Sequence, residues 1–316
     1  MEQGKYAFGI DVGGTTIKLG VFDAGYGELL EKWEIPTRKE DKGGHILEDV
    51  AASVKSKLAE KGWSDADIVG VGIGVPGPVL DGGVVDGAVN LHWGVVDVAG
   101  TLAGLLGGMP VKVGNDANVA ALGEQWKGGG KGYQNVIMVT LGTGVGGGII
   151  LNGAILPGAH GAGGEIGHML VSHHETEFCN CGKKGCLEQF ASASGIVRIA
   201  RKQIAASQEK TILCNDEWLS AKIIFDAAKK GDALALSTVD AFGKKLGEGL
   251  AMINAVIDPD VVVIGGGVSK AGQMVLDVVE KYYMPAAFHA CRKTLFRLAE
   301  LGNDAGMYGA VRMVLQ

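Results

Sequence analysis

Residues 6–23, YAFGIDVGGTTIKLGVFD, combine two apolar runs with a turn of glycine and threonine between them. Short apolar runs bounded by glycine and aspartate predict strands, so we expect a hairpin here and a third strand at 29–35. In the turn, Asp11 precedes the run Gly13-Gly14-Thr15. Glycines lack a Cβ, so phosphate oxygens can approach the backbone N–H groups, and threonine hydroxyls can donate to them. The turn is a candidate phosphate site, although an ordinary hairpin turn would use the same residues.

The same pattern returns in the second half of the chain. An apolar run at 136–141 ends at Gly142-Thr143-Gly144, and 148–151 again predicts a strand. Each half then continues with helical periodicity and further apolar runs. These lie at 45–61 and 68–75 in the first half, and at 234–257, 261–264 and 305–314 in the second. The repetition predicts a duplicated α/β domain with two lobes around a cleft.

We place the boundary so that 1–115 form an N-terminal lobe and 116–316 a larger C-terminal lobe, with the final helix packing back on the first lobe.

Composition excludes several classes of partner. The chain has 316 residues, 47% of them hydrophobic, and a formal net charge of −6 without a long basic run. Nucleic-acid binding is therefore not expected. The N-terminus shows neither a signal peptide nor an apolar stretch long enough to span a bilayer, so we expect a cytoplasmic protein that does not bind membranes.

A third glycine turn, Gly265-Gly266-Gly267, follows the buried strand expected at 261–264 and precedes a helical pattern at 270–281. This order suits a nucleotide site, and it also suits a plain strand-to-helix turn. The glycines at 142, 144 and 147 fit the dinucleotide fingerprint, but a strand follows them where that fingerprint requires a helix. A P-loop motif is absent from the sequence.

Three cysteines are clustered within eight residues. Cys179, Cys181 and Cys186 supply three thiolates at short spacing, and His168 completes a Cys₃His set. Such a set predicts a closed tetrahedral zinc site, whose role is structural because no position is left for water. The cysteines are the firmer part of the prediction, since His173 and His174 also lie nearby.

Asp116 is the candidate general base. It lies in Gly114-Asn115-Asp116-Ala117-Asn118, between a short strand at 111–113 and a helical run at 119–126. Asparagine and aspartate are common at helix N-termini for capping alone. A carboxylate in that place also stays ionised and can accept a proton from a hydroxyl, so both roles are compatible.

With these motifs in place, the sequence resembles the ROK family of sugar kinases and repressors. The most specific part is Glu165-x-Gly167-His168 followed by Cys179-x-Cys181-Gly-x-x-Gly185-Cys186-x-Glu188. The resemblance covers essentially the whole chain. It implies the duplicated actin-like, hexokinase-like fold and ATP-dependent phosphorylation of a hexose at its 6-hydroxyl, glucose being the expected substrate.

The resemblance also implies roles for individual residues. Asp116 would take the proton from the sugar hydroxyl, and Asp11 would hold Mg²⁺ through water. The positions that match sugar ligands are Gly77, Asn90, Asn115, Asp116, Glu165, His168 and Glu188. The positions that match the ATP site are Asp11, Gly13, Gly14, Thr15, Gly142, Thr143, Gly144, Gly265, Gly266 and Gly267.

Three alternatives stay open at this point. Kinases for N-acetylmannosamine, N-acetylglucosamine, fructose, mannose or allose would use similar ligands. A sugar-responsive repressor would need a DNA-binding module ahead of Asp11, for which we expect no room. An NAD-dependent oxidoreductase would leave the zinc loop without a role. Similar proteins are typically homodimers or homotetramers, so we expect one of these states. We also expect a role in glycolysis.

Overall fold

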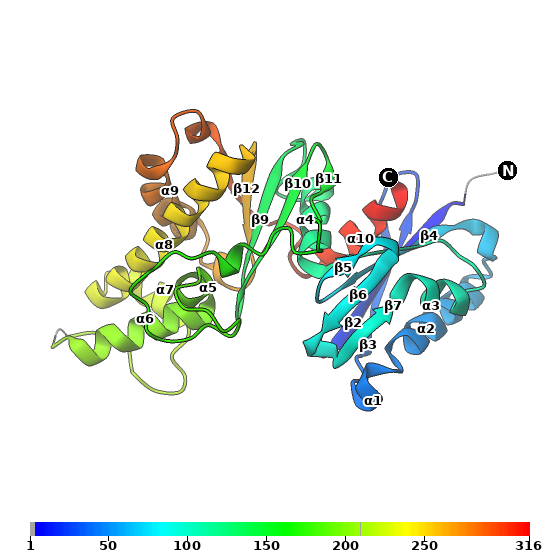
Figure 1. The fold of residues 1–316 in the computed structure, drawn as a ribbon, viewed down its shortest axis with the longest axis horizontal. Coiled ribbons are helices and arrows are strands. Elements are labelled where there is room, and N and C mark those ends of the chain that lie inside the picture. The colour runs from blue at the N-terminus through cyan, green and yellow to red at the C-terminus, as the bar shows by residue number, and fades with distance from the viewer. Residues whose placement is uncertain (1–3, 209) are drawn as a thin grey trace. The chain divides into compact units, whose positions relative to one another are not determined.

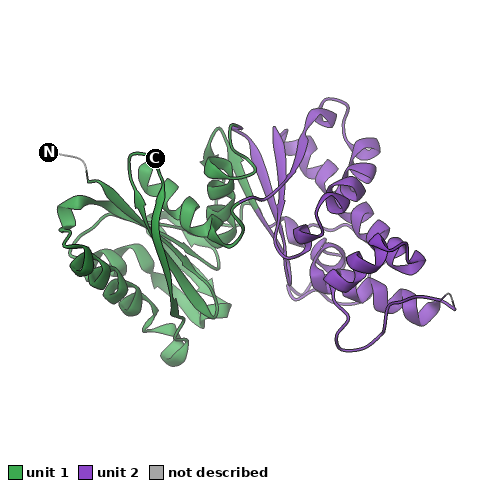
Figure 2. Cartoon of the chain, turned by 180° about the vertical axis from the view of Figure 1, so that it is seen from behind, with its two compact units in different colours: residues 1–132, 148–164, 301–316 green, residues 133–147, 165–300 purple. Residues whose placement is uncertain are grey.

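The computed structural model describes residues 4–208 and 210–316. The chain divides into two compact units, which Figure 2 colours separately: unit 1 comprises 1–132, 148–164 and 301–316, and unit 2 comprises 133–147 and 165–300. Helix α4 (Asp116–Lys127), which lies beyond the expected boundary at 115/116, and the C-terminal helix α10 (Ala305–Leu315) both belong to unit 1.

The duplication that the repeated glycine turn predicts is confirmed by two five-stranded sheets with equivalent strand order, β3-β2-β1-β4-β8 and β11-β10-β9-β12-β13 (Figure 1). In the first sheet, β1 pairs antiparallel with β2 and parallel with β4. In the second, β12 pairs parallel with β9 and β13. The strands of the first sheet are β1 (Tyr6–Val12), β2 (Thr16–Asp23), β3 (Leu29–Pro36), β4 (Ile68–Val75) and β8 (Val111–Asn115). Those of the second are β9 (Val136–Leu141), β10 (Val145–Leu151), β11 (Ala154–Ile155), β12 (Val261–Gly265) and β13 (Leu295–Leu298).

The first sheet is covered on both faces. Alternate residues of β1, among them Phe8 and Ile10, pack with helices α2 (Ile46–Lys61) and α3 (Val98–Leu105) in one apolar core. The other face carries glycine, which lets α10 come close. A Cβ on Gly9 would lie 2.3 Å from the carbonyl oxygen of Met307, so a larger residue would push the helix away.

The second unit is mainly helical around the second sheet. The buried strand β12 precedes a 3₁₀ turn (Val268–Ala271) and helix α9 (Gln273–Ala286), and the long helix α8 (Ala233–Ile257) packs beside α9 (Figure 1). Gly272, with φ 78°, interrupts the helix that the sequence predicts from Lys270 onward. The remaining helices are α5 (Glu188–Ala191), α6 (Ala193–Ala206) and α7 (Ala221–Lys229).

Unit 1 also contains a three-stranded sheet, β5-β6-β7, and the short helix α1 (Glu40–Gly43). The three strands are β5 (Val79–Leu80), β6 (Val84–Ala88) and β7 (Trp93–Asp97). Across the described residues, no helix combines the length and apolar character that crossing a membrane requires.

Candidate functional site

The first glycine turn joins β1 to β2 in unit 1. Its shape is held by backbone and side-chain contacts: Gly13 N donates to Thr16 O at 3.0 Å, and the Thr37 hydroxyl donates to Gly13 O at 2.7 Å. Asn90 lies next to this turn, because a Cβ on Gly14 would be 3.8 Å from its carbonyl oxygen. The structure therefore brings a predicted sugar residue to the predicted phosphate turn.

Asp11 is the next-to-last residue of β1, just before this turn. Its Oδ2 lies 3.8 Å from Nζ of Lys18, the residue opposite it in the β1–β2 register. Burial raises the pKa of the Asp11 carboxyl, and the charge of Lys18 opposes that rise. A Cβ on Gly306 would lie 2.6 Å from the carboxyl carbon, so α10 begins directly against it. A buried carboxylate with one partly compensating cation suits a water-mediated Mg²⁺ site.

Lys18 is a neighbour of Asp11 that the sequence analysis left out, because a lysine in a strand usually points to solvent. Its Nζ also donates to the carbonyl of Asn303 at 3.2 Å, and its side chain is 23% exposed. The hairpin register contained the signal. Once the turn is centred between Gly14 and Thr15, Asp11 and Lys18 must be cross-strand neighbours.

Asn115 and Asp116 lie where β8 passes into α4. Asn115 Oδ1 accepts from the amides of Ala117 at 3.1 Å and Asn118 at 3.2 Å, so Asn115 is the N-cap of the helix. Its Nδ2 donates to Gly77 O at 3.1 Å. Asp116 Oδ1 accepts from the amide of Ala117 at 2.8 Å. Three predicted sugar residues, Gly77, Asn115 and Asp116, thus lie together in unit 1.

Gly77 could not be replaced by another residue without rearrangement. Its φ is 93°, and a Cβ would lie 2.2 Å from the carbonyl oxygen of Gly87. A Pro-Gly turn at Pro76-Gly77 by itself favours glycine at this position. The turn holds the Gly77 carbonyl against Asn115.

The second glycine turn lies in unit 2 between β9 and β10. Gly142 N donates to Gly144 O at 3.0 Å, and Ala193 N donates to Gly142 O at 2.8 Å. Glu188 reaches this turn, since its Oε2 accepts from the amide of Val145 at 3.0 Å. A Cβ on Gly144 would lie 2.2 Å from the same oxygen, so only glycine leaves room for the carboxylate.

The third glycine turn lies beside the second. Gly266, with φ 84°, packs against the end of β9, where a Cβ would lie 2.5 Å from Leu141 O. Gly267 lines a cavity of about 130 Å³ together with Phe225, Lys222 and Lys270. Both predicted ATP segments of this unit, 142–144 and 265–267, therefore lie at adjacent strand ends of one sheet.

His168 and the three cysteines form one cluster in unit 2. Their ligand atoms all lie within 4.8 Å of one another, with Cys179 Sγ 3.9 Å from His168 Nδ1 and Cys181 Sγ 3.6 Å from Cys186 Sγ. A tetrahedral zinc with bonds of about 2.3 Å to sulfur and about 2.0 Å to nitrogen needs ligand atoms about 3.5–3.8 Å apart. The cluster has nearly these dimensions.

The donor set fits zinc in its chemistry as well. Burial raises the pKa of Cys186 to about 12, and hydrogen bonding from the Lys183 backbone lowers the pKa of Cys181. A metal cation bound between these closely spaced thiols would stabilise their ionised forms. His168 is the histidine of the cluster, in preference to the alternatives His173 and His174.

The cluster of His168 and the three cysteines contacts the other predicted sugar residues of unit 2, and His168 belongs to both sets. His168 Nε2 lies 4.0 Å from Glu165 Oε2, while its Nδ1 faces Cys179. The second oxygen of Glu188, Oε1, lies 3.7 Å from Cys179 Sγ. Glu165, His168 and Glu188, which the sequence predicts as sugar ligands, thus surround one side of the metal cluster.

Comparison with known proteins gives a consistent result. The ROK family matches residues 7–316. A glucokinase of Halalkalibacterium halodurans is 43% identical, covering 99% of this chain and 96% of the relative, and a glucokinase of Thermotoga maritima is 34% identical over 97% and 96%.

Solved structures agree with this comparison. The ROK hexokinase of Thermus thermophilus superimposes with a TM-score of 0.80 at 32% identity, covering 97% of this chain and 96% of that one. A ROK glucokinase of Streptomyces griseus, solved with glucose and AMPPNP, gives 0.76 at 33% identity over 98% of both chains. The predicted duplicated α/β class is confirmed, and with a match over nearly its whole length this chain belongs to the ROK family.

Proposed function

We propose that this chain transfers the γ-phosphoryl group of ATP to the 6-hydroxyl of glucose, with Asp116 as the general base. The glucokinase relatives and the ROK kinase structures support an ATP-dependent sugar kinase. The observation that carries the role of Asp116 is local. Asn115 is the N-cap of α4 and donates to Gly77, and the Asp116 carboxylate shares the amide of Ala117 with the Asn115 side chain.

The reaction requires a nucleophile, a phosphoryl site and a proton acceptor. The sugar oxygen attacks the γ-phosphorus, the bond from that phosphorus to the β–γ bridging oxygen breaks, and ADP leaves. The hydroxyl proton passes to the carboxylate of Asp116. A carboxylate in the first turn of a helix stays ionised near neutral pH, because the positive end of the helix dipole favours the charge.

The glycine turns provide the phosphate sites in this proposal. Residues 13–15 of unit 1 and 142–144 of unit 2 would hold phosphate oxygens with backbone N–H groups, and 265–267 would border the adenosine. Asp11 is the residue that would hold Mg²⁺, which supplies charge neutralisation on the phosphates.

The candidate sugar residues form two groups. In unit 1, Asn115 precedes Asp116 and donates to Gly77, while Asn90 lies beside Gly14. In unit 2, His168 lies 4.0 Å from Glu165, and Glu188 contacts Cys179. A zinc ion held by His168, Cys179, Cys181 and Cys186 would have a structural role, because protein ligands would fill all four positions of a tetrahedral site.

Other hexoses are the second candidate. Relatives include an N-acetylgalactosamine kinase of Shewanella at 33% identity and an N-acetyl-D-glucosamine kinase of Yersinia enterocolitica at 32%. A putative xylose repressor of Caldicellulosiruptor, at 31%, represents the non-catalytic class, and this chain covers 77% of its length. We also propose a homodimer or homotetramer and a cytoplasmic location, which sedimentation and cell fractionation test.

The experiment compares kcat/KM for glucose, mannose, fructose, allose, N-acetylglucosamine and N-acetylmannosamine with MgATP. We expect glucose to be preferred. Asp116→Asn should fold normally and lose turnover by about 10²–10⁴-fold, since this is what a positioned base contributes. Near-normal turnover in Asp116→Asn would refute the base, and no turnover of any sugar by the wild type would refute the kinase.

A further inference from the structure

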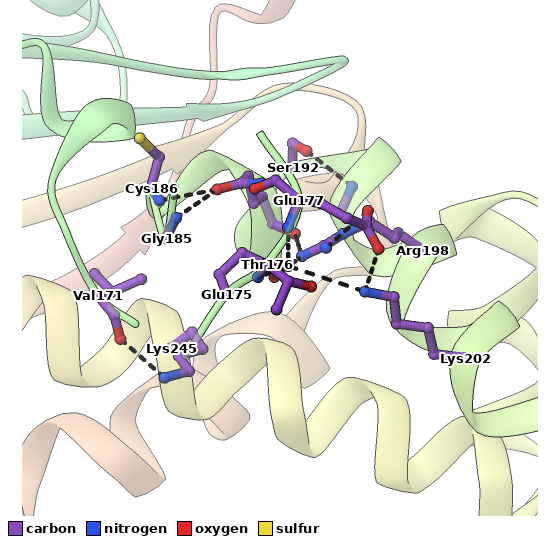
Figure 3. A network of polar contacts seen from close by, with 12 residues as sticks. Val171, Glu175, Thr176, Glu177, Gly185, Cys186, Ser192, Arg198, Lys202 and Lys245 are labelled. Carbon is purple, nitrogen blue, oxygen red and sulfur yellow. Dashed lines mark hydrogen bonds and ion pairs between the residues drawn. The ribbon is translucent and has the colours of Figure 1, made fainter. Parts of the chain in front are cut away.

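The side chain of Gln189, the residue after Glu188, joins both sides of the zinc loop. Its Oε1 accepts from the amide of Gly185 at 2.8 Å and from the amide of Cys186 at 3.1 Å. Its Nε2 donates to the carbonyl of Glu177 at 3.0 Å. One amide group thus ties the turn before the last cysteine to the segment before the first one. Figure 3 shows the two amides directed at the same acceptor.

Arg198 holds Gln189 in turn. From α6, its Nη2 donates to the main-chain carbonyl of Gln189 at 2.9 Å and to Glu175 at 2.8 Å, and its Nη1 donates to Glu177 at 3.2 Å. Lys202, one turn further along α6, pairs with Glu177 (Figure 3). The bond to Arg198 lowers the pKa of Glu175 to about 2, so this attachment stays charged throughout the neutral range.

We propose that Gln189 is a positioning residue that couples zinc retention to sugar binding. The inference rests on the proposed role of Glu188 in binding the sugar. Gln189 directly follows Glu188, and its side chain binds the amide of Cys186. One side chain therefore fixes the position of a candidate metal ligand relative to a candidate sugar ligand. Outer-shell hydrogen bonds of this kind orient metal ligands and are needed for tight binding.

The backbone around Gln189 has further support. Val171 N donates to Gly185 O at 2.8 Å, and the Val171 carbonyl accepts from Lys245 Nζ at 2.9 Å (Figure 3). Val145 holds Glu188 from the side of the second glycine turn. Removing the Gln189 amide should therefore loosen the loop without unfolding unit 2 or displacing that turn.

The test compares zinc release and kinetics in the full-length zinc-loaded protein. Zinc transfer to a colorimetric chelator is followed in wild type, Gln189→Ala and Gln189→Glu, and glucose KM and kcat are measured on the same preparations. We expect Gln189→Ala to release zinc about tenfold faster, the lower end of measured outer-shell effects, with a parallel rise in glucose KM and little change in kcat.

Gln189→Glu supplies an intermediate case. It keeps an acceptor for the two amides and loses the donor to Glu177, so its release rate should fall between the other two. Gln273→Ala is the matched control, because Gln273 donates to Asp277 within its own helix, α9. Its release rate and KM should equal those of the wild type.

Each outcome decides the proposal. Faster release together with a higher KM supports the coupling, whereas either change without the other overturns it, as does wild-type behaviour of Gln189→Ala. A fall in kcat at unchanged KM would also overturn it. The release measurement needs no turnover, so a wild type that phosphorylates no sugar would refute the kinase and still leave the attachment of the zinc loop open to measurement.

Discussion

Replacing Gly309 with alanine should destabilise unit 1, because α10 and α4 lie too close for another methyl group. A Cβ on Gly309 would lie 1.7 Å from the carbonyl oxygen of Val119 and 2.9 Å from the amide nitrogen of Gly123. Both atoms belong to the backbone of α4, so no flexible side chain can move aside. The helices must separate, and Asp116 at the start of α4 must move with them.

The size of the effect follows from the geometry. Overpacking a well-packed interior costs about 1–3 kcal/mol, and contact with backbone places this site near the upper end. Alanine regains about 0.5–1 kcal/mol of helix propensity, which offsets only part of that cost. A net loss of about 2 kcal/mol corresponds to a fall of roughly 4–8 °C in melting temperature for a unit of this size.

Gly104→Ala is the matched control. Gly104 is exposed in α3, and a Cβ there would have nothing within 4 Å. The same substitution should therefore stabilise the unit by about 0.5 kcal/mol. Urea unfolding followed by tryptophan fluorescence measures both variants, and Trp126 reports on the interface because its ring lies 6.3 Å from that of Tyr308 on α10. An unfolding midpoint for Gly309→Ala at or above the wild-type value would refute the close approach of the two helices.

Two further predictions concern the zinc loop. Cys181→Ser should lower zinc content and the melting temperature of unit 2, since one of four ligands is lost, and elemental analysis showing full occupancy would contradict the ligand assignment. Glu175→Gln should be less stable than the wild type above about pH 4.5, because the folded pKa of Glu175 is lowered from 4.5 to about 2 and its ionised form is the stabilised one. The difference in free energy of unfolding should shrink as the pH falls from about 4.5 toward 2, and a difference independent of pH would count against the Glu175–Arg198 pair.

Regular local patterns account for what the sequence predicted well. The apolar runs formed strands within a few residues of their expected bounds, and 68–75 and 136–141 did so without a shift. Helix α8 was expected at 234–257 and begins one residue earlier. Such elements are recognisable because burial on one or both faces imposes a period on the residues themselves. The cysteine spacing similarly identified the metal cluster, since its ligands lie close in sequence.

Features that depend on distant residues were not predicted. Arg198 contacts Glu175 across 23 positions, and nothing in either local sequence marks the pair. The sheet of β5, β6 and β7 was not predicted because its strands are short. β5 has two residues, too few for the alternation of apolar and polar residues to be recognised. Nothing in the sequence indicated that 148–164 belongs to unit 1 after the chain has entered unit 2 at residue 133.

The role of Glu188 explains why the zinc loop and the second glycine turn must be considered together. One of its oxygens accepts from Val145 in the turn, the other contacts Cys179, and the residue after it binds the amide of Cys186. A change at Glu188 itself should therefore disturb both the zinc loop and the second glycine turn. A change at Gln189 removes the attachment on the loop side alone and leaves the bond to Val145. Substitutions at these two adjacent positions therefore distinguish the contribution of the zinc loop to sugar binding from that of the second glycine turn.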